Sequence, residues 1–203
     1  MIKVQLNLRL KNFLIFTNVL IIFILVFLFY FLSRKLINDL ENYTFNFFLS
    51  TSKYLASRFK NYVQYGQIKA LELVLKQELE NNKLDENLVA LYFFDSTKKM
   101  ILSYSIDPNI NIPLNLDYLS DNSLINFYKE LIKRDKGRFL IIYLPIKQTI
   151  ISDVQEEVNI GYLVTVFSLK NLDHRIGFIY YLSLFTFISV ILIYIFLLFF
   201  IIS

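Results

Sequence analysis

Two apolar stretches stand out in the pattern of hydrophobic and polar positions, one near each end of the chain. Residues 12–33 and 176–203 contain no charged side chain. A helix of about 20 apolar residues spans the roughly 30 Å hydrocarbon core of a bilayer and satisfies its own backbone hydrogen bonds there. The pattern therefore predicts membrane helices at 13–32 and 176–202. Two buried core helices of a soluble protein are the alternative.

Helical spacing continues beyond the first apolar stretch. Residues 33–64 contain neither glycine nor proline, and large apolar side chains recur there mostly three or four positions apart. We expect one long helix that runs on from the membrane and pairs with a second copy of itself, although the repeat is too loose for a strict heptad seam. Gly66 interrupts the pattern, and 67–82 predicts a second helix that ends at Asn81 and Asn82.

Strand patterns fill most of the middle of the chain. Residues 88–95 and 100–106 are apolar and aromatic runs joined by the polar tetrad STKK, which predicts a β-hairpin. Residues 138–146 and 156–169 predict two further strands, with a polar connection around 152–153. Strands framed by helices are typical of an α+β domain with an antiparallel sheet.

A loop and a third helix are predicted between the two pairs of strands. Pro108 and Pro113 mark the loop. The helix is expected over 123–137, where Gly137 acts as the stop signal. Four apolar side chains would share one face of this helix: Leu124, Tyr128, Leu131 and Ile132.

The distribution of charge predicts the topology. The net charge is +4, yet no acidic residue precedes Asp39, and three basic residues precede the first apolar stretch. This asymmetry holds residues 1–12 in the cytoplasm, places 33–175 outside, and returns 176–202 through the inner membrane. The first apolar stretch is longer than the core of a signal peptide and lacks a small-x-small cleavage site, so we interpret it as an uncleaved anchor.

The composition offers little for catalysis. Without cysteine there is neither a disulfide nor a thiol nucleophile, and four glycines form no phosphate-binding loop. His174 is the only histidine, and without a Gly-x-Ser-x-Gly turn we interpret it as an interfacial loop residue rather than a catalytic base. The Glu156–Glu157 pair lacks converging partners for a metal, and no basic stripe favours a nucleic acid. We therefore predict a protein that is not an enzyme and holds no cofactor.

Binding is better supported by the strand residues. Tyr92, Tyr104 and Tyr143 lie within predicted strands, and Lys147 ends one of them. Alternation along a strand places Tyr143 and Lys147 on the same face. Phenols and a cation together predict a pocket for a small anionic or polar ligand. The alternative is that the tyrosines are core or boundary residues and that Lys147 is solvated.

Three segments carry a resemblance to a known family. They read LVALYFFDSTKKMILSYS, GRFLIIYLPIK and VNIGYLVTVFSL. This series resembles the single Cache domain, also called the PDC or extracytoplasmic PAS-like sensor, over most of 33–175. The resemblance implies a long N-terminal helix, a central antiparallel sheet, Asp95 as the hairpin aspartate, and Ile160, Gly161 and Tyr162 as the late strand motif. The hairpin turn of that family usually carries a glycine, whereas residues 96–99 contain none.

The resemblance also implies a role. Such domains are usually dimers that convert ligand binding into movement of the membrane helices. We therefore expect the sensor module of a bacterial signal-transduction receptor, which binds an unknown small ligand. Because the chain ends at Ser203 inside an apolar run, we expect the output region to be missing from it, as in a split or truncated receptor, or to belong to a separate transducer. The alternative is a membrane-anchored accessory protein whose outer domain docks a partner protein.

Overall fold

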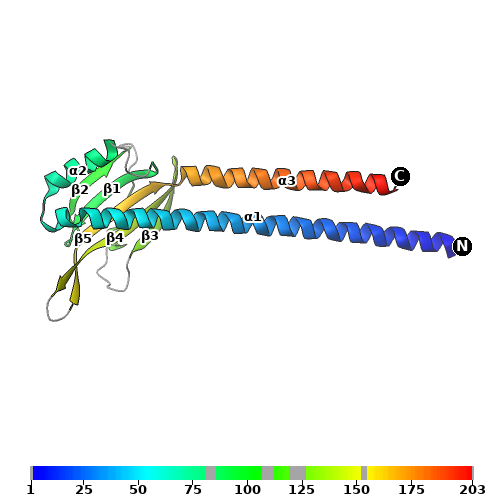
Figure 1. Cartoon of the computed structure of the whole chain (residues 1–203), viewed down its shortest axis with the longest axis horizontal. Coiled ribbons are helices and arrows are strands. Elements are labelled where there is room, and N and C mark those ends of the chain that lie inside the picture. Colours follow the sequence, from blue (N-terminus) through cyan, green and yellow to red (C-terminus); the bar gives the residue numbers. More distant parts are fainter. Residues whose placement is uncertain (1, 81–85, 107–111, 119–126, 152–154, 203) are drawn as a thin grey trace. The chain divides into compact units, whose positions relative to one another are not determined.

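The chain forms two compact units. The computed structural model describes residues 2–80, 86–106, 112–118, 127–151 and 155–202 (Figure 1). The helical unit comprises 1–42 and 172–203, and the sheet unit comprises 43–171. In chain order the elements are α1 (Ile2–Gln64), α2 (Ile68–Glu80), β1 (Leu88–Asp95), β2 (Met100–Ser105), η1 (Leu116–Tyr118), β3 (Tyr128–Arg134), β4 (Gly137–Ile151), β5 (Gln155–Ser168) and α3 (Lys170–Ile202). The fold class is α+β, as predicted.

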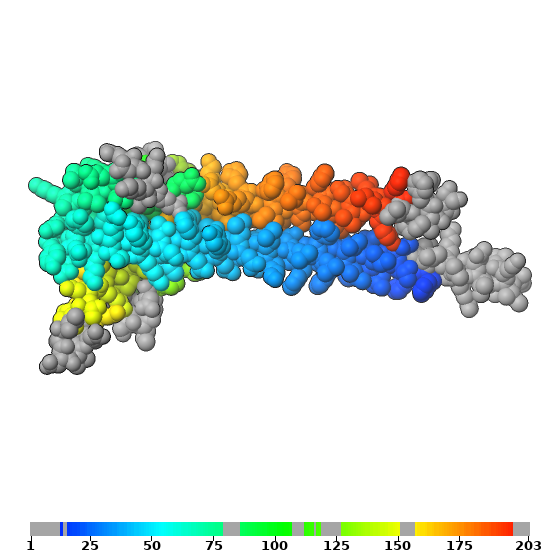
Figure 2. Space-filling model, viewed as in Figure 1, coloured from blue at the N-terminus to red at the C-terminus, as the bar shows by residue number. Residues whose placement is uncertain are grey.

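The helical unit consists of the first part of α1 and most of α3. Both helices are long and apolar enough to cross a membrane. Within the unit they lie side by side, in blue and in orange to red (Figure 2). Among the described residues, the side-chain contacts that join them include Phe29 with Phe187, Ser33 with Ser183, and Asn18 with Tyr194. Two long apolar helices therefore stand where the sequence predicts them.

The start of α3 differs from the prediction. Its first residue, Lys170, donates its backbone N–H to the Ser168 hydroxyl at 3.3 Å, and Asp173 lies in the first turn. A hydroxyl cap and an early carboxylate both stabilise a helix N-terminus. His174 is therefore an exposed residue of a helix, and its interpretation as a loop residue is wrong.

The end of α1 agrees with the prediction. Gly66 adopts a left-handed backbone conformation at φ 62°. Gln67 N–H donates to the Tyr62 carbonyl at 2.9 Å, and Gly66 N–H donates to the Val63 carbonyl at 3.2 Å. These two bonds form a Schellman motif, which satisfies the last carbonyl groups of a helix. The chain then turns into α2, while Asn81 and Asn82 lie outside the described residues.

The sheet unit is built on five antiparallel strands in the order β2-β1-β5-β4-β3. β1 and β2 form the predicted hairpin. In its turn, Lys98 adopts φ 66°, a left-handed conformation that favours glycine. The Asp95 carboxylate compensates by accepting hydrogen bonds from the backbone N–H groups of Thr97 and Lys99 and from the Thr97 hydroxyl. These bonds, the Thr97 hydroxyl first, lower the pKa of Asp95.

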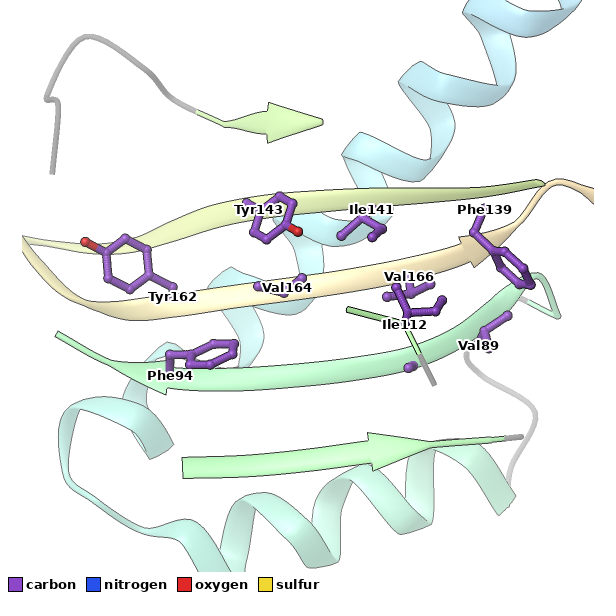
Figure 3. Packing of buried hydrophobic residues seen from close by; sticks show 10 residues of the cluster. Val89, Phe94, Ile112, Phe139, Ile141, Tyr143, Tyr162, Val164 and Val166 are labelled. Carbon is purple, nitrogen blue, oxygen red and sulfur yellow. The ribbon is translucent and has the colours of Figure 1, made fainter. Parts of the chain in front are cut away.

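Alternation along the strands gives the sheet two different faces. The helix face comprises Leu91, Phe93, Leu140, Ile142, Leu163, Thr165 and Phe167, and α1 packs against it. The tyrosine face comprises Ala90, Tyr92, Phe94, Tyr128, Glu130, Phe139, Ile141, Tyr143, Tyr162, Val164 and Val166. In Figure 3 the labelled side chains of this second face lie on the side of the sheet away from α1.

Aromatic stacking and one hydroxyl pair fix α1 on the helix face. The rings of Phe48 and Phe167 are parallel, with centroids 4.3 Å apart. Phe59 meets Phe93 edge to face at 5.8 Å. Burying a phenylalanine side chain stabilises a fold by about 1.5–3 kcal/mol, so these aromatic contacts contribute strongly to the stability of the unit.

Gly161 marks the closest approach of β5 to its neighbours. A Cβ atom added there would lie 2.5 Å from the Phe94 carbonyl oxygen and 3.1 Å from Val63 Cγ1. The adjacent residue, Ile160, is skipped in the pairing of β4 with β5, which is the signature of a bulge. Glycine is needed here because of close packing.

The third predicted helix is wrong over the residues that the structure describes. Tyr128–Arg134 forms strand β3, and Asp135–Lys136 turns into β4. Gly137, with φ 128°, starts β4 instead of ending a helix. Residues 119–126 lie outside the described part. Antiparallel pairing with β4 overrides the helical spacing, because alternate positions of β3 face the core.

Candidate functional site

Four aligned positions form a row across the tyrosine face. Tyr92 on β1 is paired with Val164 on β5, which is paired with Tyr143 on β4. Tyr143 is in turn paired with Tyr128 on β3. Directly paired residues on adjacent strands lie about 4.5–5.5 Å apart, so the three phenols share one surface.

A fourth aromatic ring joins this row from outside the sheet. Tyr118, the last residue of η1, stacks on Tyr128 with ring centroids 3.7 Å apart and an angle of 23°. It meets Tyr143 edge to face at 5.5 Å. The rings of Tyr128 and Tyr143 lie 6.1 Å apart. We call Tyr118, Tyr128 and Tyr143 the tyrosine cluster.

Polar groups surround the hydroxyl of Tyr143. This hydroxyl accepts a hydrogen bond from the backbone N–H of Asn115 at 3.2 Å. It donates to the Glu130 carboxylate at 3.4 Å, a long contact near the limit for a hydrogen bond. The Asn115 side chain accepts from the Asp117 N–H at 3.0 Å, which holds the segment in a turn. The cluster therefore carries a carboxylate and phenols.

Burial and hydrogen bonds raise the pKa values of the phenols on this face above the ordinary value of about 10. Burial raises the pKa of Tyr143 to about 12, and the nearby Glu130 charge adds to the effect. A hydrogen bond with Tyr118, followed by burial, raises the pKa of Tyr128. Burial also raises the pKa of Tyr92. At neutral pH these hydroxyls are hydrogen-bond donors and acceptors rather than anions.

The structure places the four candidate residues from the sequence in three different environments. Tyr92 and Tyr143 lie in the same row of the tyrosine face. Tyr104 is paired with Leu91 and therefore lies on the opposite side of the sheet. Lys147 lies beyond the bulge, and its ammonium group forms an ion pair with Glu157 at 3.3 Å. Tyr92 and Tyr143 therefore lie in the row of the cluster, Tyr104 lies on the opposite face, and Lys147 lies further along β4, where its ammonium group is paired.

Sequence reasoning missed three residues of the cluster region. Tyr118, Tyr128 and Glu130 were not among the candidates because their segment was assigned to a loop and a helix. A signal was nevertheless present, because Asp135–Lys136–Gly137 is a turn sequence directly before the apolar run of residues 139–146. A hairpin at that turn would place Tyr128 directly opposite Tyr143.

Over the ranges that the structure describes, no three His, Asp or Glu side chains converge on one point. His174 is exposed on α3. The site offers recognition by aromatic faces, hydroxyl groups and one carboxylate.

The sequence was compared with known families and proteins. No protein-family model matches it, and no curated protein matches it significantly. The geometry of the sheet unit and the two apolar helices are therefore the features that bear on function.

Proposed function

We propose that this chain is a two-pass sensor of the bacterial inner membrane, with a Cache-like domain outside. α1 and α3 would cross the bilayer, and the sheet unit would bind a small polar ligand. The observation that carries the proposal is a sheet with two unlike faces. One face is packed on the long helix that continues into an apolar segment, and the other bears a cluster of phenols with a carboxylate.

The chemistry of the cluster favours a ligand with an amino group. Faces of tyrosine rings attract cations, and Glu130 supplies the opposite charge. The nearest candidate cation from the sequence, Lys147, is paired with Glu157. The proposal therefore narrows the expected small anionic or polar ligand to a primary amine or an amino acid.

Transmission would use the continuity of α1. This helix runs without interruption from Ile2 to Gln64, and Phe48, Ser52 and Phe59 on its last part contact the sheet. A ligand that binds one packing of sheet and helix better than another shifts the population between them. The shift would pass along the helix to a separate transducer.

A melting experiment on the full chain in detergent tests the binding step. A panel of primary amines, amino acids and dicarboxylates is added, and the unfolding temperature is measured. A ligand at a hundred times its dissociation constant stabilises by about 2.7 kcal/mol, which gives a measurable shift. Glu130→Gln should abolish the shift, whereas Tyr104→Phe, on the other face, should preserve it. A panel without any shift would count against the sensor proposal.

The topology has its own test. A protease added to spheroplasts should cut the sheet unit and leave the two apolar segments intact. Protection of the sheet unit in intact spheroplasts, together with cleavage after lysis, would reverse the proposed orientation.

We further propose that α1 pairs with α1 of a second copy. Tyr43, Phe47 and Tyr54 are all exposed and are spaced four and seven residues apart, so they share one helical stripe. Phe48 and Phe59, which pack on the sheet, lie on the opposite side of the helix. An exposed apolar stripe of this kind marks an interaction surface.

Disulfide trapping tests this pairing, because the chain contains no cysteine. Phe47→Cys should form a cross-linked dimer on mild oxidation. Lys53→Cys, exposed on a different side of α1, is the matched control and should remain monomeric. If the stripe captures a different protein in stoichiometric amounts while Phe47→Cys stays monomeric, the docking role for an accessory protein is the better proposal.

A further inference from the structure

A groove lies between the two helices of the helical unit. Its volume is about 290 Å³. One end is lined by apolar side chains, and the other by polar and aromatic ones. The apolar end comprises Val26, Phe29, Leu184 and Phe187.

The polar end contains one cation. Arg34 lines the groove beside Tyr30 and Tyr180. No acidic residue forms an ion pair with Arg34 in the part of the chain that the structure describes. The hydroxyls of Ser33 and Ser183 are 2.5 Å apart and satisfy each other, so the guanidinium is the charged group that this end offers to a ligand.

The position of the groove in the sequence matches a membrane boundary. The uncharged segment ends at Ser33, directly before Arg34 and Lys35. Tyrosines are enriched where hydrocarbon meets the headgroup region, and arginine side chains extend toward that region. The apolar end of the groove would then lie at the depth of acyl chains, and its charged end at the depth of phosphates.

We propose that this groove binds an anionic phospholipid, with the phosphate at Arg34 and an acyl chain along Phe29 and Phe187. The inference rests on the proposed membrane topology. The size of the groove selects this occupant over a helix of a second copy, because a helix with its side chains is about 10–12 Å wide. The volume lies near the lower limit of small-molecule sites, which run from about 300 Å³, so the groove takes part of one lipid.

Native mass spectrometry of the delipidated full chain in detergent tests the proposal. Phosphatidylglycerol or phosphatidylcholine with identical acyl chains is added, and retained lipid is counted. A basic residue near a membrane surface contributes about 1 kcal/mol to the binding of an anionic lipid, which corresponds to about fivefold in affinity. We expect phosphatidylglycerol to be retained about fivefold more strongly.

Two variants locate the site, and one serves as a control. Arg34→Gln should remove the preference for phosphatidylglycerol. Leu184→Trp, which fills the apolar end, should reduce retention of both lipids. Lys35→Gln changes the same charge at the neighbouring exposed position outside the groove and should alter retention less than twofold.

The outcomes separate this inference from the proposed function. Equal retention of the two lipids by the wild type, or equal effects of Arg34→Gln and Lys35→Gln, would overturn the lipid site and leave the sensor proposal intact. A chain that alkaline carbonate releases from membranes would contradict the proposed topology itself, before any lipid is added.

Discussion

The two faces of the sheet are occupied in different ways. On the helix face, Phe48 and Phe59 of α1 pack against the aromatic rings of Phe167 and Phe93. On the tyrosine face, phenol rings and the Glu130 carboxylate lie beside the short segment 112–118. Apolar packing serves stability and tolerates little change, whereas polar groups at partly buried positions serve recognition. Substitutions of the buried apolar side chains on either face should therefore destabilise the domain, whereas those of the partly buried Tyr118, Tyr128 and Glu130 should mainly alter binding.

The largest effect is expected from Phe167→Ala. Phe167 is fully buried and stacked on Phe48, so its removal leaves a cavity between helix and sheet. Such truncations cost about 3–5 kcal/mol. Chemical denaturation of the full chain in detergent measures the loss. Leu73→Ala, at an exposed position of α2, is the control and should cost less than about 1 kcal/mol.

The next effect is expected from Gly161→Ala. The added methyl group would meet the Phe94 carbonyl, which belongs to backbone and cannot rotate away. Overpacking of this kind costs roughly 1–3 kcal/mol. Gly177→Ala is the matched control, because nothing lies within 4 Å of its added Cβ, and it should be neutral or stabilising. Equal stability of the two variants would contradict the close packing at β5.

The hydroxyl pair of Ser52 and Thr165 allows a double-mutant cycle. Both side chains are fully buried, and their oxygens are 2.6 Å apart. Ser52→Ala alone should cost about 1–2 kcal/mol, because it leaves the Thr165 hydroxyl with one partner fewer. The double variant Ser52→Ala/Thr165→Val should lose less unfolding free energy than the sum of the losses in the two single variants. Strict additivity would show that the hydroxyls do not interact.

A smaller and pH-dependent effect is expected from Tyr143→Phe. The change leaves the Asn115 N–H without its acceptor and should cost about 1 kcal/mol at neutral pH. Because the pKa of Tyr143 is raised to about 12 in the folded state, from 10.0, the proton stabilises the fold below pH 10, and this contribution is lost as the pH rises toward 12. The free energy of unfolding, measured between about pH 10 and pH 12, should therefore decline more steeply for the wild type than for Tyr143→Phe.

The smallest effect is expected from Lys98→Gly, in a turn that belongs to neither face. Lys98 has a left-handed backbone conformation, which costs a non-glycine residue about 1–2 kcal/mol. Glycine removes this strain but loses more entropy on folding, so the net gain should be about 0.5–1 kcal/mol. Lys99→Gly is the control and should not stabilise. Ligand-induced melting shifts should be the same in both variants, since neither touches the tyrosine face.

Much of the fold could be predicted because local signals agreed with the final structure. The hairpin over 88–106 combined strand residues with a polar turn, and Gly66 stopped α1 where a left-handed residue was needed. The failure over 128–134 has a physical cause. Tyr128, Leu131 and Ile132 fit a helical stripe, but Tyr128, Glu130 and Ile132 fit strand alternation equally well. Only pairing with β4 decides between these two patterns.

The candidate site was predicted less well than the fold, because the site depends on contacts between distant segments. Strand alternation alone cannot tell which face a helix will cover, so Tyr104 was grouped with Tyr92 although they point to opposite sides. The bulge near Ile160 shifts the register of β5 and brings Glu157 beside Lys147. No sequence pattern predicts this bulge. Tyr118 reaches the cluster only through the fold of η1 against the sheet.

The hydroxyl pair of Ser52 and Thr165 also limits how α1 can slide on the sheet. It is a polar contact inside an apolar interface, flanked by the stacked rings of Phe48 and Phe167. A small axial shift of α1 would separate the two hydroxyls and leave them buried without each other, while a shift of one helical turn, about 5.4 Å, would place a different residue opposite Thr165. The interface therefore favours a few discrete positions of α1 on the sheet. Any motion of this helix relative to the sheet should be stepwise and not graded.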